Sequence, residues 1–74
     1  MPERILRAPI PGIVQSIVVK EGQNVKFGET VVFINVMKME NPVAANANGK
    51  IKKVLVKEWD EIHYGDPLFI IEEK

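Results

Sequence analysis

Short apolar stretches separated by polar turns make up the whole hydropathy pattern of the chain. The stretches Thr30 to Val36 and Pro67 to Glu72 are almost continuously apolar, which is typical of strands buried on both faces. Val and Ile dominate the chain, and no window repeats apolar residues at the three-and-four spacing of a helix. We therefore expect an all-β chain with almost no helix, folded as a flattened β-barrel or sandwich of about eight short strands.

Alternation in the second half of the chain predicts which side chains face inward. Ile51, Val54 and Val56 are the apolar positions, so they should point into the core. The alternation skips a residue between Ile51 and Val54, which predicts a β-bulge. The outward positions are then Lys50, Lys52, Lys53 and Lys57. These lysines form either a solvated strand face or a docking surface for an acidic partner.

The two halves of the chain repeat one another. A shift of 37 positions aligns residues 8–35 with residues 45–72 without a gap. The identical pairs are Ala8/Ala45, Gly12/Gly49, Val19/Val56, Lys20/Lys57, Glu21/Glu58, Gly28/Gly65 and Ile34/Ile71. Two copies are too few for a solenoid, which needs about three. We therefore expect both halves to close around one core with a pseudo-twofold axis, so that residues 1–74 form a single domain.

Each half contains the same local irregularities. The skip in alternation recurs around Gln15, so a bulge is expected in both halves. A polar bend in each half then precedes a single apolar plug, Val25 or Ile62. A second turn follows at Gly28 or Gly65, where the missing Cβ permits a positive φ.

Composition and charge exclude several classes of protein. Ten Lys and Arg residues balance ten Asp and Glu residues, which leaves none of the basic excess of a nucleic-acid binder. No apolar run exceeds four residues, so no membrane insertion is expected. The absence of cysteine excludes disulfides and a thiol nucleophile, and it fits a reducing compartment. We expect a soluble, cytoplasmic protein.

Few side chains offer catalytic or metal-binding chemistry. Ser16 is the only serine and has no nucleophile-elbow sequence around it. His63 is the only histidine, and a single imidazole with scattered carboxylates lacks the spacing of metal ligands. We expect His63 to lie in a surface turn, and we expect neither a catalytic residue nor a metal site.

One lysine lies at the junction between the two halves. An apolar strand leads into Lys38, and Pro42 favours an extended segment after it, so Lys38 should lie at the tip of a hairpin. An amine in this position is accessible to a modifying enzyme, although an ordinary solvated turn lysine is the alternative. Met37 and Met39 flank it, and these side chains either form an adaptable surface for partners or pack inward.

The segment Met37-Lys38-Met39-Glu40 lies between two halves that each contain a Lys-Glu pair and a later glycine. This arrangement resembles the biotinyl domain of biotin-dependent carboxylases. The resemblance covers roughly residues 5–73 and includes the opening segment Ala8-Pro9-Ile10-Pro11-Gly12. It implies a flattened, pseudo-symmetric β-barrel with biotin joined to Lys38 by an amide bond. It further implies that Met37 and Met39 are flanking recognition residues and that Glu40 is a weaker member of the motif.

The resemblance also implies a non-catalytic carrier with three partners. A biotin protein ligase would attach biotin, a biotin carboxylase would load a carboxyl group, and a carboxyltransferase would pass that group to an acyl-CoA or a keto acid. A lipoyl carrier domain is one alternative, although it usually has Asp before the lysine. An unmodified β adaptor module is the other. The first bend, Lys20 to Val25, is too short for the thumb of many bacterial acetyl-CoA carboxylase carriers. We therefore expect a pyruvate, propionyl-CoA or related carboxylase, a decarboxylase or a transcarboxylase.

Two positions depart from the pattern of that family. Asn35-Val36 stands where Glu-Ala is common, so a charge is lost and we expect the β-branched side chain of Val36 to crowd the tip. Trp59 occupies the position equivalent to Gly22. If that position requires a positive φ, the second bend must either differ from the first or be strained. The Trp59 side chain either covers a neighbouring surface or is a docking anchor for a partner.

Overall fold

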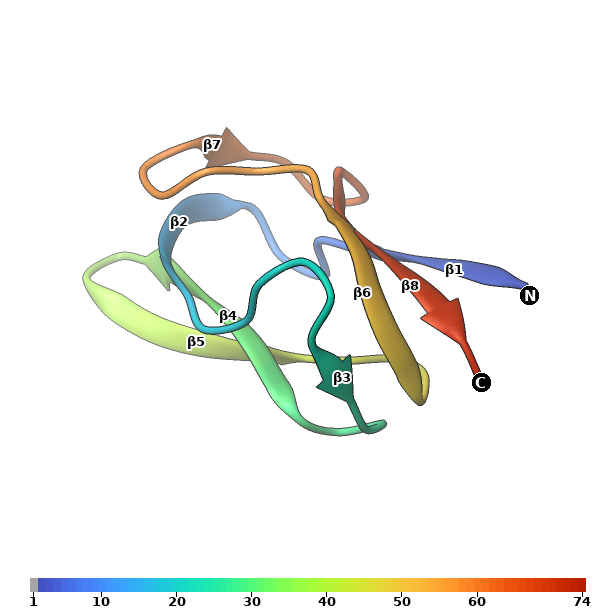
Figure 1. Cartoon of the computed structure of the whole chain (residues 1–74). Coiled ribbons are helices and arrows are strands. Elements are labelled where there is room, and N and C mark those ends of the chain that lie inside the picture. The colour runs from blue at the N-terminus through green and yellow to red at the C-terminus, as the bar shows by residue number, and fades with distance from the viewer. Residues whose placement is uncertain (1) are drawn as a thin grey trace.

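Two four-stranded antiparallel sheets build the fold in this computed structural model, which describes residues 2–74 (Figure 1). The strands are β1 (Glu3–Arg7), β2 (Gly12–Ile17), β3 (Asn24–Val25), β4 (Thr30–Val36), β5 (Met39–Ala44), β6 (Gly49–Val54), β7 (Glu61–Ile62) and β8 (Pro67–Glu73). Residues 2–74 contain no helix, and thus no helix that is long and apolar enough to cross a membrane. The all-β prediction is confirmed.

The sequence repeat determines the topology. Strands β2, β3 and β4 recur 37 positions later as β6, β7 and β8. One sheet has the order β1-β8-β6-β3, and the other has the equivalent order β5-β4-β2-β7. Each sheet therefore combines strands from both halves, because β1 and β3 flank β8 and β6. Neither half can complete a sheet alone, so the two halves interlock around one hydrophobic core.

The inward-facing residues lie where the alternation predicts. Ile51 is fully buried, and Val54 and Val56 are partly buried against the core. The apolar plugs Val25 and Ile62 are both buried. The predicted outward residues Lys50, Lys52, Lys53 and Lys57 are all exposed. Burial of these aliphatic side chains is the main favourable contribution to the stability of such a small fold.

Both predicted bulges are present. The register between β2 and β4 shifts between Val14 and Ser16, and the register between β6 and β8 shifts between Ile51 and Lys53. The two shifts lie at equivalent positions of the repeat, so the bulge belongs to the structure that the two halves share.

Two glycines allow close contact between neighbouring strands. A Cβ atom on Gly12 would lie 2.6 Å from the carbonyl oxygen of Asn35, and one on Gly49 would lie 2.1 Å from that of Glu72. Both distances are far below van der Waals contact, so no other residue fits without movement of the backbone. Gly12 therefore allows the start of β2 to pack closely against the end of β4, next to the hairpin.

The molecule is elongated, with principal extents of 37 × 17 × 17 Å. The β4–β5 hairpin lies at one end, and both chain ends lie together at the other (Figure 1). The backbone N–H of Glu73 donates a hydrogen bond to the carbonyl of Pro2 at 2.9 Å, which joins the two ends. The hairpin tip therefore lies far from the end that holds Pro2 and Glu73.

Candidate functional site

Lys38 lies in a two-residue turn that joins β4 to β5. Val36 and Met39 form the last strand pair before this turn. Met37 and Lys38 both have positive φ, 52° and 68°, which is the pattern of a type I′ hairpin turn. Such turns strongly favour Asn and Gly, and neither occurs here. The turn is therefore strained by about 1 kcal/mol or more at each residue, and the surrounding strands must maintain it.

Asparagine side chains hold the strained turn in place. The Oδ1 atom of Asn35 accepts a hydrogen bond from the backbone N–H of Lys38 at 3.1 Å. The Nδ2 group of Asn35 donates to Oε1 of Gln15 at 3.0 Å, which ties the hairpin to β2. On the other strand, Nδ2 of Asn41 donates to the carbonyl oxygen of Met39 at 3.1 Å. The backbone of Lys38 is thus positioned by polar contacts from both flanking strands.

The contribution of Asn35 and Asn41 to holding the turn was not predicted from the sequence. The signal was available, because Asn at the start of a turn commonly hydrogen-bonds the backbone a few residues later. From the sequence, Asn35 was interpreted only as the loss of a charge, whereas in the structure its side chain caps the turn. Val36 also differs from expectation, because its side chain is half-buried against the core and does not crowd the tip.

The side chains at the tip point into solvent. Met37 is 91% exposed and Met39 is 69% exposed, so neither packs inward. Lys38 and Glu40 are exposed as well. Within residues 2–74, no hydrogen bond or ion pair involves the Nζ atom of Lys38 or the carboxylate of Glu40. The prediction of an accessible lysine at the tip of a hairpin is therefore confirmed.

Trp59 adopts the same bend as Gly22 and is strained by it. The N–H of Gly22 donates to the carbonyl of Ile51 at 2.7 Å, and the N–H of Trp59 donates to the carbonyl of Val14 at the same distance. Gly22 has a φ of 90°, and Trp59 has a φ of 75°, which is unfavourable for a bulky side chain. The indole remains 68% exposed, so it covers little of the neighbouring surface.

The remaining candidates lie apart from the tip amine. His63 is exposed in the turn after β7, with its Nδ1 atom 3.7 Å from a carboxylate oxygen of Asp66. The part of the chain from residue 2 to residue 74 holds no cluster of three or more side chains that could ligate a metal ion. The chemistry available at the tip is thus that of one primary amine, which can form an amide with an activated carboxyl group.

The fold and the tip together define a class of protein. A doubled β scaffold presents one exposed lysine at its apex, an arrangement that is suited to the covalent attachment of a group to that lysine. Comparison with known proteins identifies the family. The family described as "Biotin-requiring enzyme" matches residues 4–71, and this chain belongs to it.

Individual relatives agree with this assignment. The chain is 40% identical over 68 residues to the propionyl-CoA carboxylase alpha chain of Sus scrofa, and the match covers 92% of this chain and 9% of that protein. It is also 40% identical over 65 residues to the biotin carboxyl carrier protein of acetyl-CoA carboxylase from Pyropia yezoensis, which covers 88% of this chain and 40% of the relative. The chain thus spans less than half the length of these relatives.

Solved structures share the fold over almost the entire chain. A single-chain, multi-domain long-chain acyl-CoA carboxylase matches with a TM-score of 0.89 and 30% identity, over 97% of this chain and 7% of that one. The urea carboxylase of Kluyveromyces lactis matches with the same TM-score and identity, over 97% of this chain and 6% of that enzyme. The resemblance to biotinyl domains of carboxylases is confirmed.

Proposed function

We propose that this chain is a biotin carboxyl carrier domain in which Lys38 is the residue that carries biotin. Residues 1–74 form one biotinyl domain in this proposal, and the chain itself is not catalytic. The observation that carries the assignment is the unpaired, exposed Lys38 side chain at the apex of a two-residue turn. In a member of the biotin-requiring family, a lysine at the apex of a hairpin is one whose amine a ligase can reach without unfolding any part of the scaffold.

The residues around Lys38 fit a covalently attached group. Biotin, once bound, supplies the ureido nitrogen that carries a carboxyl group. The protein supplies position, because the Asn35 hydrogen bond fixes the backbone of Lys38 while the four-carbon stem of the lysine remains free to swing. Met37 and Met39 offer exposed thioethers, which are polarisable and adaptable enough to contact several partners in turn.

The carrier needs three partners in this proposal: a biotin protein ligase, a biotin carboxylase and a carboxyltransferase. The names of the relatives, which are carboxylase chains and carboxylase carrier proteins, support the last two. Similarity to a propionyl-CoA carboxylase chain and to the carrier protein of an acetyl-CoA carboxylase favours an acyl-CoA as the carboxyl acceptor. A protein domain joined at the end that holds Pro2 and Glu73 leaves the hairpin accessible, because the hairpin lies at the opposite end. A cytoplasmic location stays a prediction.

Intact-mass spectrometry tests the attachment directly. The chain is expressed with a biotin protein ligase and biotin, and the expected result is a mass increase of one biotin. Lys38→Arg should lose the increase. The matched control is Lys26→Arg, which removes another exposed turn lysine and should retain it. An increase only with a lipoyl ligase and lipoic acid would identify a lipoyl carrier instead, and no increase with either ligase would leave an unmodified adaptor.

A further inference from the structure

A groove with apolar walls lies directly beside the Lys38 hairpin. It has a volume of about 380 Å³ and lies between the end of β4, the start of β2 and the short strand β7. Its apolar lining includes Pro11, Ile13, Val36 and Ile62, and its polar lining includes Glu61 and His63. Asn35 of β4 also lines the groove, which therefore combines apolar walls with hydrogen-bonding side chains from β4 and from the β7 segment.

The groove lies next to the attachment lysine. Met37 lines the groove and is covalently next to Lys38, so a group linked to the flexible lysine side chain is tethered beside the groove. A tethered ligand has a high effective concentration at a site within its reach, even where its intrinsic affinity for that site is weak. A shallow groove in this position can therefore be occupied for part of the time by a group that would not bind it from free solution.

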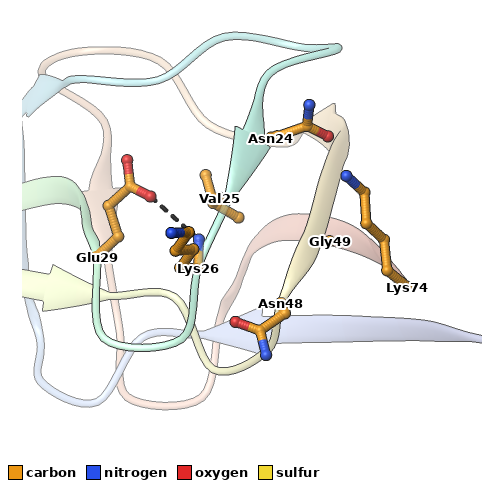
Figure 2. Close-up of a pocket in the computed structure, with 7 residues that line it drawn as sticks. All are labelled: Asn24, Val25, Lys26, Glu29, Asn48, Gly49 and Lys74. Atoms are coloured by element: carbon orange, nitrogen blue, oxygen red, sulfur yellow. Dashed lines mark hydrogen bonds between the residues drawn. The ribbon is translucent and has the colours of Figure 1, made fainter.

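The repeat supplies an internal comparison for this groove. An equivalent groove of about 470 Å³ lies at the opposite end of the molecule, lined by Asn24, Val25, Lys26, Glu29, Asn48, Gly49 and Lys74 (Figure 2). Figure 2 shows polar and charged side chains around it, with the amide of Asn48 and the ammonium groups of Lys26 and Lys74 among them.

Equivalent positions of the two grooves differ in chemistry. Pro11 is replaced by Asn48, and Met37 is replaced by Lys74. Ile13 corresponds to Lys50, which is exposed on β6. The scaffold thus forms the same hollow twice, because the backbone repeats, and at these positions the hairpin groove has Pro11 and Met37 where the far groove has polar or charged side chains.

We propose that the hairpin groove is a docking site for the biotin arm of Lys38 itself. This inference rests on the proposed function. The fused rings of biotin are largely apolar and suit the walls formed by Ile13, Val36 and Ile62. The ureido group has two N–H donors and one carbonyl acceptor, and it suits the rim, where the Glu61 carboxylate can accept a hydrogen bond. When docked, the arm lies against the scaffold between reactions in the partner active sites. Binding of a partner to the hairpin then releases the arm from the groove.

Nuclear magnetic resonance of the chain before and after biotinylation tests the docking. Spectra of ¹⁵N-labelled protein report shift changes at each backbone amide, and mass spectrometry confirms complete modification. We expect changes at Ile13, Glu61 and His63 in addition to those at the hairpin, residues 36–40. Changes confined to residues 36–40 would overturn the proposal, because the arm would then be free in solution.

Variants that copy residues from the equivalent positions of the other half distinguish a loss of docking from a loss of folding. Ile13→Lys places in the groove the residue found at the equivalent position, and it should abolish the shift changes at Glu61 and His63 while leaving those at residues 36–40. The converse exchange, Lys50→Ile, alters the far end and should leave the groove changes intact. If Ile13→Lys lowers stability, His63→Lys provides the same test in an exposed turn, since its equivalent is Lys26. Persistence of the groove changes in both groove variants would contradict the proposal.

A chemical route keeps the docking test independent of the ligase. The chain has no cysteine, so Lys38→Cys can be labelled at one site with a biotin maleimide, and N-ethylmaleimide gives the control without biotin. Groove shift changes with the biotin reagent alone would support docking even if no ligase modified Lys38. Failure of ligase modification would count against the proposed function, whereas equal spectra for the two reagents would count against docking.

Discussion

The side-chain oxygen of Asn35 accepts a hydrogen bond from the backbone N–H of Lys38, 3.1 Å away, and in this way caps the turn that presents the lysine. We expect Asn35→Ala to lower the free energy of unfolding by about 1 kcal/mol, the usual contribution of one hydrogen bond. The initial rate of biotinylation should also fall, because the backbone of Lys38 loses its fixed position. Urea denaturation and timed mass spectrometry measure the two effects.

Two further variants assign the effect to the cap. Asn35→Asp keeps an oxygen acceptor for the Lys38 N–H and should retain most of the biotinylation rate. Gln15→Ala removes only the other hydrogen bond of Asn35 and should leave the rate near that of the wild type. Equal rates for Asn35→Ala and the wild type would show that the cap does not position the lysine.

The positive φ of Met37 predicts a conflict between stability and recognition. Asn tolerates a φ near 52° far better than Met, so Met37→Asn should raise the free energy of unfolding by about 1 kcal/mol. The same variant should be biotinylated more slowly, because it loses a thioether that is 91% exposed at the tip. Met39→Asn is the control, since Met39 lies in β5 and gains no relief of strain. A gain in stability for Met39→Asn equal to that for Met37→Asn would contradict the strained turn.

The close approach of Gly49 to the backbone of Glu72 predicts a large loss of stability when a single methyl group is added. Gly49→Ala places a Cβ 2.1 Å from the carbonyl oxygen of Glu72, so β6 and β8 must separate, and we expect a loss of about 3 kcal/mol in the free energy of unfolding. Gly28→Ala has open space around the new Cβ but a φ of 89°, so it should cost only about 1 kcal/mol. Thermal and urea unfolding of both variants measure the difference. A smaller loss for Gly49→Ala than for Gly28→Ala would contradict this account.

Trp59 should be replaceable by glycine with a gain in stability. Trp59→Gly relieves the strain of a φ of 75° and sacrifices little packing, because the indole is 68% exposed. We expect an increase of about 1 kcal/mol in the free energy of unfolding. The mirror variant Gly22→Trp should lose a similar amount, since it introduces the same strain in the first half. A loss of stability for Trp59→Gly would show that the indole packs more tightly than its exposure indicates.

The repeat explains why so much of the fold could be predicted. Both bulges, the buried plugs Val25 and Ile62, and the positive φ of Gly28 and Gly65 were predicted because each signal occurs twice at equivalent positions. The tip position of Lys38 was predicted because it lies between the halves, where one strand must reverse into the next. Such features depend on local backbone preferences and on the inward or outward facing of side chains, and both can be read along a single strand.

Other features arise only when distant segments meet. The exchange of strands between the halves depends on pairing partners such as β1 and β8, which are separated by nearly the whole chain. The link from Asn35 to Gln15, and the groove between β2, β4 and β7, likewise depend on side chains brought together from different strands. The repeat, the strands and the exposed lysine follow from the order of residues alone. The surroundings of that lysine depend on contacts between strands, and these are set by register and packing across the whole fold.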